Sequence, residues 1–304
     1  MASTLTMWTA VNKKYELFIP TFIFFAAKSN PGSRVVIGLE NVAEFESVHS
    51  AALSYLERED DIDFGLVETD FSLSIPHAVR FLDFPEFDTE WVYFTDADVM
   101  LTDDVLEASA EGLSKTGLPF NNVVRAGTRR LTGLHLHHVG KLWPSLSRGL
   151  KVPDSWTSKN DEEILYELVE GWVREGFEAH LEGATRPVPG LHVSLFSRFP
   201  LGSIRAEDGS RWIGWGGGSR ERADPDKILA VLASDQFLEL ERRMAPSAAL
   251  VGAAIKLFCL AKLAENEVEV RNIPALTGPE ELNARLAKRL HEAETGQFFE
   301  PETN

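Results

Sequence analysis

The chain has 304 residues, and 44% of them are hydrophobic, which is enough to bury one substantial core with a satellite element. Its 47 acidic and 30 basic residues give a formal net charge of -17 at pH 7, so nucleic acid and anionic membrane surfaces would be repelled on average. The single cysteine, Cys259, excludes an intramolecular disulfide framework and favours a reducing cytoplasm as the location.

The amino-terminal part alternates strand-like and helix-like segments. Residues 5–11, 34–39 and 64–67 are expected to form strands, and residues 15–28 and 42–56 to form helices. The apolar stretch within the first helix contains a proline and is shorter than the roughly 20 residues that cross a bilayer, so we expect a buried helix and no transmembrane segment. Strands that alternate with helices predict a doubly wound α/β sheet.

The next strand carries the first chemical signal. Residues 74–82 are expected to be helical, and residues 91–94 form an apolar strand that leads into Thr95-Asp96-Ala97-Asp98. Carboxylates therefore follow the carboxyl end of a strand, where open α/β sheets bind their ligands. Asp96 and Asp98 could share a Mn²⁺ or Mg²⁺ ion, with diphosphate oxygens and water in the remaining positions. Aspartates are also common in such loops as turn and capping residues, but the position of this pair favours a metal site.

The second half of the chain starts with similar elements and then changes character. Residues 130–139 and 191–196 are expected to form strands, and residues 161–175 a helix. After residue 201 the pattern shifts to a Gly-rich loop and then to helical periodicity. We therefore divide the chain into a sheet-forming domain, residues 1–205, and a loop with a helical region, residues 206–304.

A series of short motifs runs through the predicted sheet-forming domain. In chain order they are Thr9-Ala10-Val11-Asn12 with Tyr15, Ala78-Val79-Arg80-Phe81, Asp96-Ala97-Asp98, Thr132-Gly133-Leu134 ahead of Trp143, Asp161-Glu162-Glu163, and His192 with Arg198. This series resembles the family-8 glycosyltransferases, the glycogenin and bacterial galactosyltransferase group. Thr132-Gly133-Leu134 stands where the family has Asn-Ala-Gly, Glu162 where its galactosyltransferases have Gln, and Leu195 where it has Gly.

The resemblance implies a GT-A fold, with a mixed sheet flanked by helices and a small helical C-terminal region. It implies a hexosyltransferase that uses a nucleotide-sugar donor, with UDP-hexose favoured, and retains the anomeric configuration. The implied metal ligands are Asp96, Asp98 and His192. The implied donor contacts are Thr9, Ala10, Val11, Asn12, Tyr15, Arg80, Asp96, Ala97, Asp98 and Arg198. The acceptor, whether a glycan, a protein or a small molecule, is not identified.

Asp161 and Glu162 are the candidate catalytic carboxylates, and they have a second explanation. Asn160 is a good N-cap residue, and acidic side chains in the first turn favour the positive end of a helix dipole. A cap explains both acids without catalysis. Both explanations can hold together, because the start of a helix is a rigid place for a carboxylate that faces a site.

His135 and His137 alternate with leucines along a predicted strand, so both lie on one face of it. We expect acceptor contact or solvent exposure for this pair and no dedicated zinc site. Thr132 and Gly133, which come just before the pair, are further candidate acceptor contacts.

Trp212 and Trp215 flank a Gly-rich loop and are also candidate acceptor contacts. They could stack on a sugar ring as part of a mobile lid, or the loop could be a plain flexible connection. The apolar stretch at residues 248–264 favours core packing or contacts in a homo-oligomer over membrane docking.

Two other functions compete with glycosyl transfer. A sugar nucleotidyltransferase can use related carboxylates, but the first predicted strand is not followed by a Gly-rich phosphate loop with a basic residue. A non-catalytic carbohydrate-binding protein would have no need of Asp96, Asp98, His192 and Arg198 together. Glycosyl transfer is therefore the favoured function.

Overall fold

The computed structural model describes residues 4–72, 75–122, 128–173, 190–193, 224–246, 248–249, 251–252 and 255–256. A mixed six-stranded sheet with the strand order β3-β2-β1-β4-β7-β6 forms its centre. The strands of this sheet are β1 (Leu5–Val11), β2 (Arg34–Leu39), β3 (Asp63–Glu68), β4 (Trp91–Phe94), β6 (Phe120–Asn121) and β7 (His135–His138). The pairs from β3 to β4 are parallel, whereas β7 pairs antiparallel with both β4 and β6.

A second, two-stranded sheet pairs β5 (Val99–Leu101) with β8 (Gly190–His192) in antiparallel orientation. The α-helices are α1 (Ile19–Ser29), α2 (Val42–Leu56), α3 (Val79–Leu82), α4 (Val105–Thr116), α5 (Asp161–Val173), α9 (Pro225–Leu232) and α10 (Asp235–Arg243). Short 3-10 helices lie at Glu16–Phe18, Pro76–Ala78, Val139–Lys141, Leu146–Arg148 and Asp154–Ser158.

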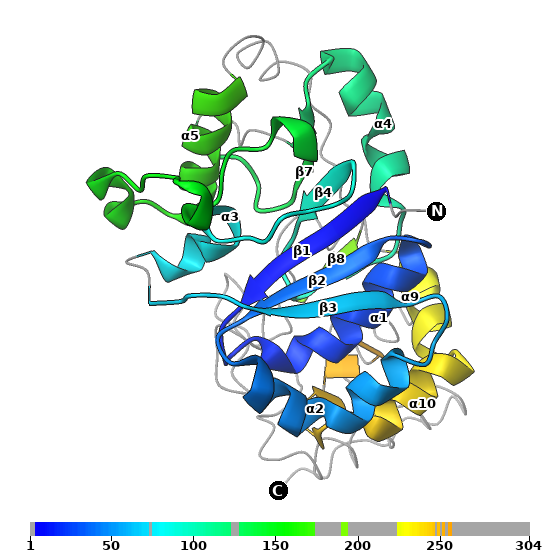
Figure 1. The fold of residues 1–304 in the computed structure, drawn as a ribbon. Helices are drawn as coiled ribbons and strands as arrows, with labels where there is room; N and C mark the ends of the chain where they lie inside the picture. Colours follow the sequence, from blue (N-terminus) through cyan, green and yellow to red (C-terminus); the bar gives the residue numbers. More distant parts are fainter. Residues whose placement is uncertain are drawn as a thin grey trace, which may run out of the picture.

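Helices cover both faces of the central sheet (Figure 1). The helices α1, α2, α9 and α10 lie on one face, and α3 and α5 lie on the other. The alternation of side chains along the strands explains this division, because Met7 packs into the first core and its neighbour Trp8 into the second. Helices on both faces are the reason that the parallel strands are apolar along nearly their whole length.

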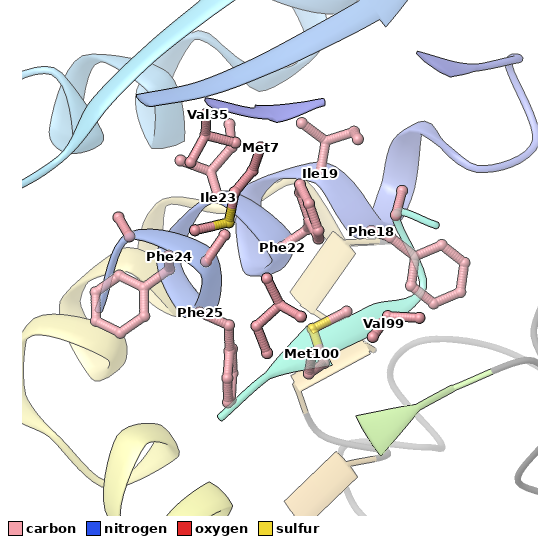
Figure 2. Packing of buried hydrophobic residues seen from close by; sticks show 14 of the residues in the cluster. Met7, Phe18, Ile19, Phe22, Ile23, Phe24, Phe25, Val35, Val99 and Met100 are labelled. Carbon is pink, nitrogen blue, oxygen red and sulfur yellow. The ribbon is translucent and has the colours of Figure 1, made fainter. Parts of the chain in front are cut away.

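The helix α1 is the centre of the first core. Figure 2 shows its phenylalanines and isoleucines packed between the sheet residues Met7 and Val35 and the strand β5. On its outer side, Phe24 and Phe25 contact Phe237 of α10, with ring centroids 5.3 and 6.1 Å apart. Each phenylalanine that folding buries contributes about 1.5–3 kcal/mol, so α1 and α10 stabilise each other.

The predicted fold class, an α/β mixed sheet flanked by helices, is confirmed, and α9 and α10 are the described helices of the predicted C-terminal region. The predicted strand at 130–139 is reduced to β7, because Thr132, ahead of it, pairs with the side chain of Asn122 rather than with a neighbouring strand. The predicted helix at 74–82 is a 3-10 turn followed by the single turn of α3. The boundary between residues 205 and 206 lies outside the described residues. Within the described part of the chain, every helix is too short or too polar to cross a bilayer.

Candidate metal centre

The candidate site lies at the carboxyl edge of the central sheet, where β1 and β4 lie side by side. The chain runs from β1 outward to β2 and β3 and then returns to β4 on the other side of β1, which makes this edge the topological switch point of the sheet. Open α/β sheets bind ligands at such points. The segments that follow the two strands, Asn12 to Tyr15 and Asp96 to Asp98, therefore both lie at this edge.

Asp96, Asp98 and His192 form one cluster, because the strand pair β5 and β8 brings His192 to the aspartates. Val99 and His192 are paired in register, and the backbone N–H of Val193 donates to the carbonyl oxygen of Asp98 at 2.6 Å. His192 Nε2 lies 3.2 Å from Asp98 Oδ1. One potential ligand atom from each of the three side chains lies within 4.8 Å of the others.

The close approach of these two strands depends on a glycine in β8. A Cβ atom built on Gly190 would lie 2.1 Å from the carbonyl oxygen of Met100, which no side chain tolerates. Gly190 therefore allows β8 to lie against β5, and this contact sets the position of His192.

The chemistry of the cluster fits a divalent metal ion. Two carboxylates and one imidazole can each donate one oxygen or nitrogen atom to such an ion. The side chains of Asp96 and His192 are 30% and 27% exposed, while that of Asp98 is only 5% exposed. The cluster thus has a closed side formed by the protein and an open side through which a ligand can approach.

Arg80 links the cluster to α5. Its Nη2 atom lies 3.0 Å from Asp96 Oδ1 and 2.8 Å from Asp161 Oδ2, and its side chain is only 10% exposed. The indole N–H of Trp8 donates to the carbonyl oxygen of Arg80 at 2.8 Å and fixes this turn of α3 on β1. Burial alone would lower the pKa of Arg80, but Asp96 and Asp161 hold the pKa above its ordinary value. Burial raises the pKa of Asp96, and Arg80 opposes that shift.

The start of α5 is a capping box. The backbone N–H of Glu163 donates to Asn160 Oδ1, and the backbone N–H of Asn160 donates to Glu163 Oε2, both at 2.9 Å. The N–H of Asn160 lowers the pKa of the Glu163 carboxyl. The capping explanation is therefore confirmed for Asn160. Asp161 is also bound to Arg80, and the backbone carbonyl of Glu162 accepts from the N–H of Leu131 at 3.2 Å.

The predicted donor residues differ in their access to solvent. Thr9, Val11 and Ala97 are buried, and Ala10 is half-buried. Asn12 is exposed, and its Oδ1 accepts from the backbone N–H of Lys14 at 3.2 Å. Tyr15 is half-buried and lies against Phe18, with ring centroids 6.0 Å apart. Arg198, Trp212, Trp215 and Cys259 lie outside the described residues.

The expected solvent exposure of His135 and His137 is wrong. Both side chains are fully buried, although they do lie on the same face of β7 as predicted. Phe120 and Trp143 cover this face, so neither histidine has surface available to an acceptor. Thr132 is also buried, whereas Gly133 is half-buried and adjoins the cluster.

Gly133 and Asn122 complete the surroundings of the site. A Cβ atom on Gly133 would lie 2.7 Å from Arg80 Nη2 and 3.3 Å from Asp96 Oδ2, so the backbone here lies directly against both side chains. Asn122, which sequence patterns do not single out, binds Thr132 through its side chain.

Comparisons with known proteins find similarity to solved structures, and at low sequence identity. Neither the family models nor the curated proteins match this chain. Among solved structures, the chain is similar to the glycosyltransferase GlyE of Streptococcus pneumoniae TIGR4, with 16% identity over 57% of this chain and 44% of GlyE and a TM-score of 0.40. It is also similar to the galactosyltransferase LgtC, with 13% identity over 59% of this chain and 67% of LgtC and a TM-score of 0.33.

A further similar structure is the mannosyltransferase PcManGT from Pyrobaculum calidifontis, in complex with GDP-Man and Mn²⁺. It has 14% identity over 97% of this chain and 81% of PcManGT, with a TM-score of 0.38. The chain spans less than half of GlyE. Because the TM-scores of all three structures lie below 0.5, these similarities carry no functional argument.

Proposed function

We propose that this chain is a metal-dependent glycosyltransferase that moves a hexose from a nucleotide-sugar donor, a UDP-sugar, to an acceptor. The observation that carries the proposal is the cluster of Asp96, Asp98 and His192 at the switch point of the sheet. These three residues occupy the metal positions of the family-8 motifs that the sequence resembles, and the strand pair β5 and β8 brings His192 to the two aspartates although it is far from them in the chain.

The cluster and the residues around it have separate tasks in this proposal. Asp96, Asp98 and His192 would hold Mn²⁺ or Mg²⁺, and the imidazole favours Mn²⁺. When bound, the ion neutralises negative charge on the diphosphate of the donor. Arg80 holds Asp96 in place and adds a fixed positive charge beside the cluster. Asn12 and Tyr15, at the end of β1, are the accessible candidates for contacts to the nucleotide.

Thermal unfolding with a panel of nucleotide sugars tests the proposal. A ligand that binds only the folded state raises its stability, so we expect a UDP-hexose to raise the melting temperature in the presence of Mn²⁺ and not with a chelator. Donor hydrolysis with the same metal would then show turnover. If the melting temperature rises with nucleoside triphosphates and a sugar phosphate but with no nucleotide sugar, that result contradicts glycosyl transfer.

Glu162 is the candidate carboxylate for chemistry at the anomeric carbon. It stands where the family's galactosyltransferases have Gln, whereas Asp161, the alternative, is bound to Arg80 Nη2 at 2.8 Å. Retention of configuration needs either a covalent intermediate or departure of the leaving group on the side that the acceptor attacks. A carboxylate at this position could attack the anomeric carbon or stabilise positive charge that develops on the sugar.

We expect Glu162→Gln to keep donor binding and to lower kcat, because the amide preserves shape but removes the charge that matters in the transition state. The measurements are kcat, the melting temperature and the NMR signal of the product's anomeric proton. A helix-dipole role alone would change stability by about 0.3–1 kcal/mol and leave kcat unchanged. A product of inverted configuration would contradict the resemblance to family 8.

A further inference from the structure

A continuous series of hydrogen bonds crosses the aromatic core beneath β7. His137 Nε2 lies 3.1 Å from the carbonyl oxygen of Lys141, and His137 Nδ1 lies 3.0 Å from His135 Nε2. His135 Nδ1 lies 3.1 Å from Asn122 Nδ2, and Asn122 in turn binds Thr132. The side chains of Asn122, Thr132, His135 and His137 are all buried.

A carbonyl group at one end of this series determines which atom donates and which accepts in each hydrogen bond. The carbonyl oxygen of Lys141 can only accept, so His137 carries its proton on Nε2 and accepts at Nδ1. His135 must then donate from Nε2 and accept at Nδ1. At Nδ1, His135 meets the amide N–H of Asn122, which donates to it. The two neutral histidines therefore fix the orientation of the Asn122 amide, with Nδ2 toward His135 and Oδ1 away from it.

In this orientation Asn122 pairs with both main-chain groups of Thr132. The backbone N–H of Thr132 donates to Asn122 Oδ1 at 3.1 Å, and Asn122 Nδ2 donates to the carbonyl oxygen of Thr132 at 2.9 Å. The Thr132 hydroxyl adds a third bond to Asn122 Oδ1 at 2.7 Å. A side chain thus provides here the two-sided pairing that a neighbouring strand would otherwise provide.

The residue that follows Thr132 forms part of the wall of the metal centre. A Cβ atom on Gly133 would lie 2.7 Å from Arg80 Nη2, so the guanidinium would have to shift, and 3.3 Å from Asp96 Oδ2, which is a tight contact. A movement of the backbone at Thr132 and Gly133 would therefore displace Arg80 or Asp96, or leave a gap beside them. The position of this short segment depends on the bonds from Asn122.

We propose that Asn122 is a positioning residue of the metal centre, because its side chain holds the Thr132–Gly133 backbone against Arg80 and Asp96. The histidine pair acts one step further away by fixing the orientation of the Asn122 amide. This inference rests on the proposed function, since it assigns Asn122 a task only if Asp96, Asp98 and His192 hold a metal ion.

The test compares two neighbouring asparagines in the full-length chain. Asn122→Ala removes every bond to Thr132, whereas Asn121→Ala removes a buried amide that lies against Gly112 of α4. Titration calorimetry with Mn²⁺ alone and the melting temperature are measured for the parent and both variants. We expect Asn122→Ala to weaken Mn²⁺ binding by about tenfold, the lower end of the range for residues that support metal ligands, and Asn121→Ala to leave it unchanged.

A folded Asn122→Ala variant that binds Mn²⁺ as tightly as the parent would overturn the proposal. If this variant does not fold, Gly133→Ala decides, because the added methyl group displaces the same wall, and unchanged Mn²⁺ affinity would again overturn it. Imidazole ¹⁵N NMR of the parent tests the other half of the inference. A proton on Nδ1 of either His135 or His137 near neutral pH would refute the fixed orientation of Asn122.

Failure of the proposed function gives a different result. If the cluster is not a metal centre, the parent and all variants give flat Mn²⁺ titrations, and the histidine tautomers remain as described. If only the positioning role is wrong, the parent and Asn122→Ala give the same clear binding curve.

Discussion

Histidines occupy two contrasting settings in this protein. His192 lies beside Asp98 at the open edge of the sheet, with 27% of its side chain exposed. His135 and His137 lie inside the second core, bonded to each other and fully buried. All three belong to short strands, so their role depends on the neighbouring strand and not on the element that carries them. A histidine is a candidate metal ligand where carboxylates lie beside it and solvent can reach it.

The buried pair is surrounded by aromatic rings. Phe120 stacks on His137 with ring centroids 6.0 Å apart, and Trp143 meets the same ring edge-on at 5.3 Å. This apolar environment disfavours a charged imidazole, and burial lowers the pKa of His137 to about 4. His137 is therefore a flat, neutral ring in the folded chain, and both histidines contribute to packing and to hydrogen bonding in the core.

The largest effect should come from His192. We expect His192→Ala and Asp98→Asn each to weaken Mn²⁺ binding by more than about 100-fold, since a direct ligand contributes more than the residues that support it. The melting temperature without metal should change little for His192→Ala, because its side chain is partly exposed. Calorimetry with Mn²⁺ measures the first effect and thermal unfolding the second.

His138 is the matched control for this experiment. It is also partly exposed and near a carboxylate, with its Nε2 atom 3.9 Å from Glu90 Oε1, but it lies on β7, away from the cluster. His138→Ala should bind Mn²⁺ like the parent. Equal losses in His138→Ala and His192→Ala would mean that the cluster is not the metal site.

The second effect is acid destabilisation through His137. Its pKa is lowered from 6.5 to about 4 in the folded chain, so the unfolded chain takes up the proton first as the pH falls. The free energy of unfolding should therefore be highest above pH 6.5 and should decrease toward pH 4, by about 3 kcal/mol for this group. Urea unfolding at a series of pH values measures the decrease.

His137→Phe isolates this contribution. The variant has no group to titrate at this position, so its stability should fall less steeply between pH 6.5 and 4 than that of the parent. Some decrease should remain, because burial also lowers the pKa of His49 to about 4. Identical slopes for the parent and His137→Phe would show that His137 is not held neutral in the folded state.

The smallest effect concerns the cap of α5. Asn160→Ala removes one half of the capping box with Glu163 and should lower the free energy of unfolding by about 1 kcal/mol. The Mn²⁺ affinity should stay the same if this turn supports only the helix. A clear loss of affinity would mean that the cap also holds Asp161 and Arg80 in place for the site.

The sequence predicts the strands and helices better than the buried contacts between side chains. The strands β1, β2 and β4 and the helix α2 form at the predicted residues, because an apolar run or a regular period of apolar residues marks each of them. The position of Asp96 and Asp98 could be predicted in the same way, because they follow β4 directly. His192 could be assigned only through the family pattern, because no local signal shows that β8 pairs with β5.

The burial of the histidine pair could not be predicted from alternation along β7. Alternation shows that His135 and His137 share a face, but both faces of this strand are covered, one of them by Trp143 from the segment that follows. No sequence pattern marks Asn122 as a residue that supports the site either. It follows Asn121, an identical residue type, and only the three-dimensional pairing with Thr132 distinguishes the two.

The contact between α1 and α10 has a consequence for how the protein is made. Phe24 and Phe25 leave the ribosome before their partner Phe237, which is synthesised more than 200 residues later. At about 5–20 residues per second, the aromatic surface of α1 lacks this cover for roughly 10–40 s in each round of translation. The nascent chain is therefore most prone to aggregation during this interval, and chaperones that bind aromatic segments should affect its yield more than the stability of the finished fold would suggest.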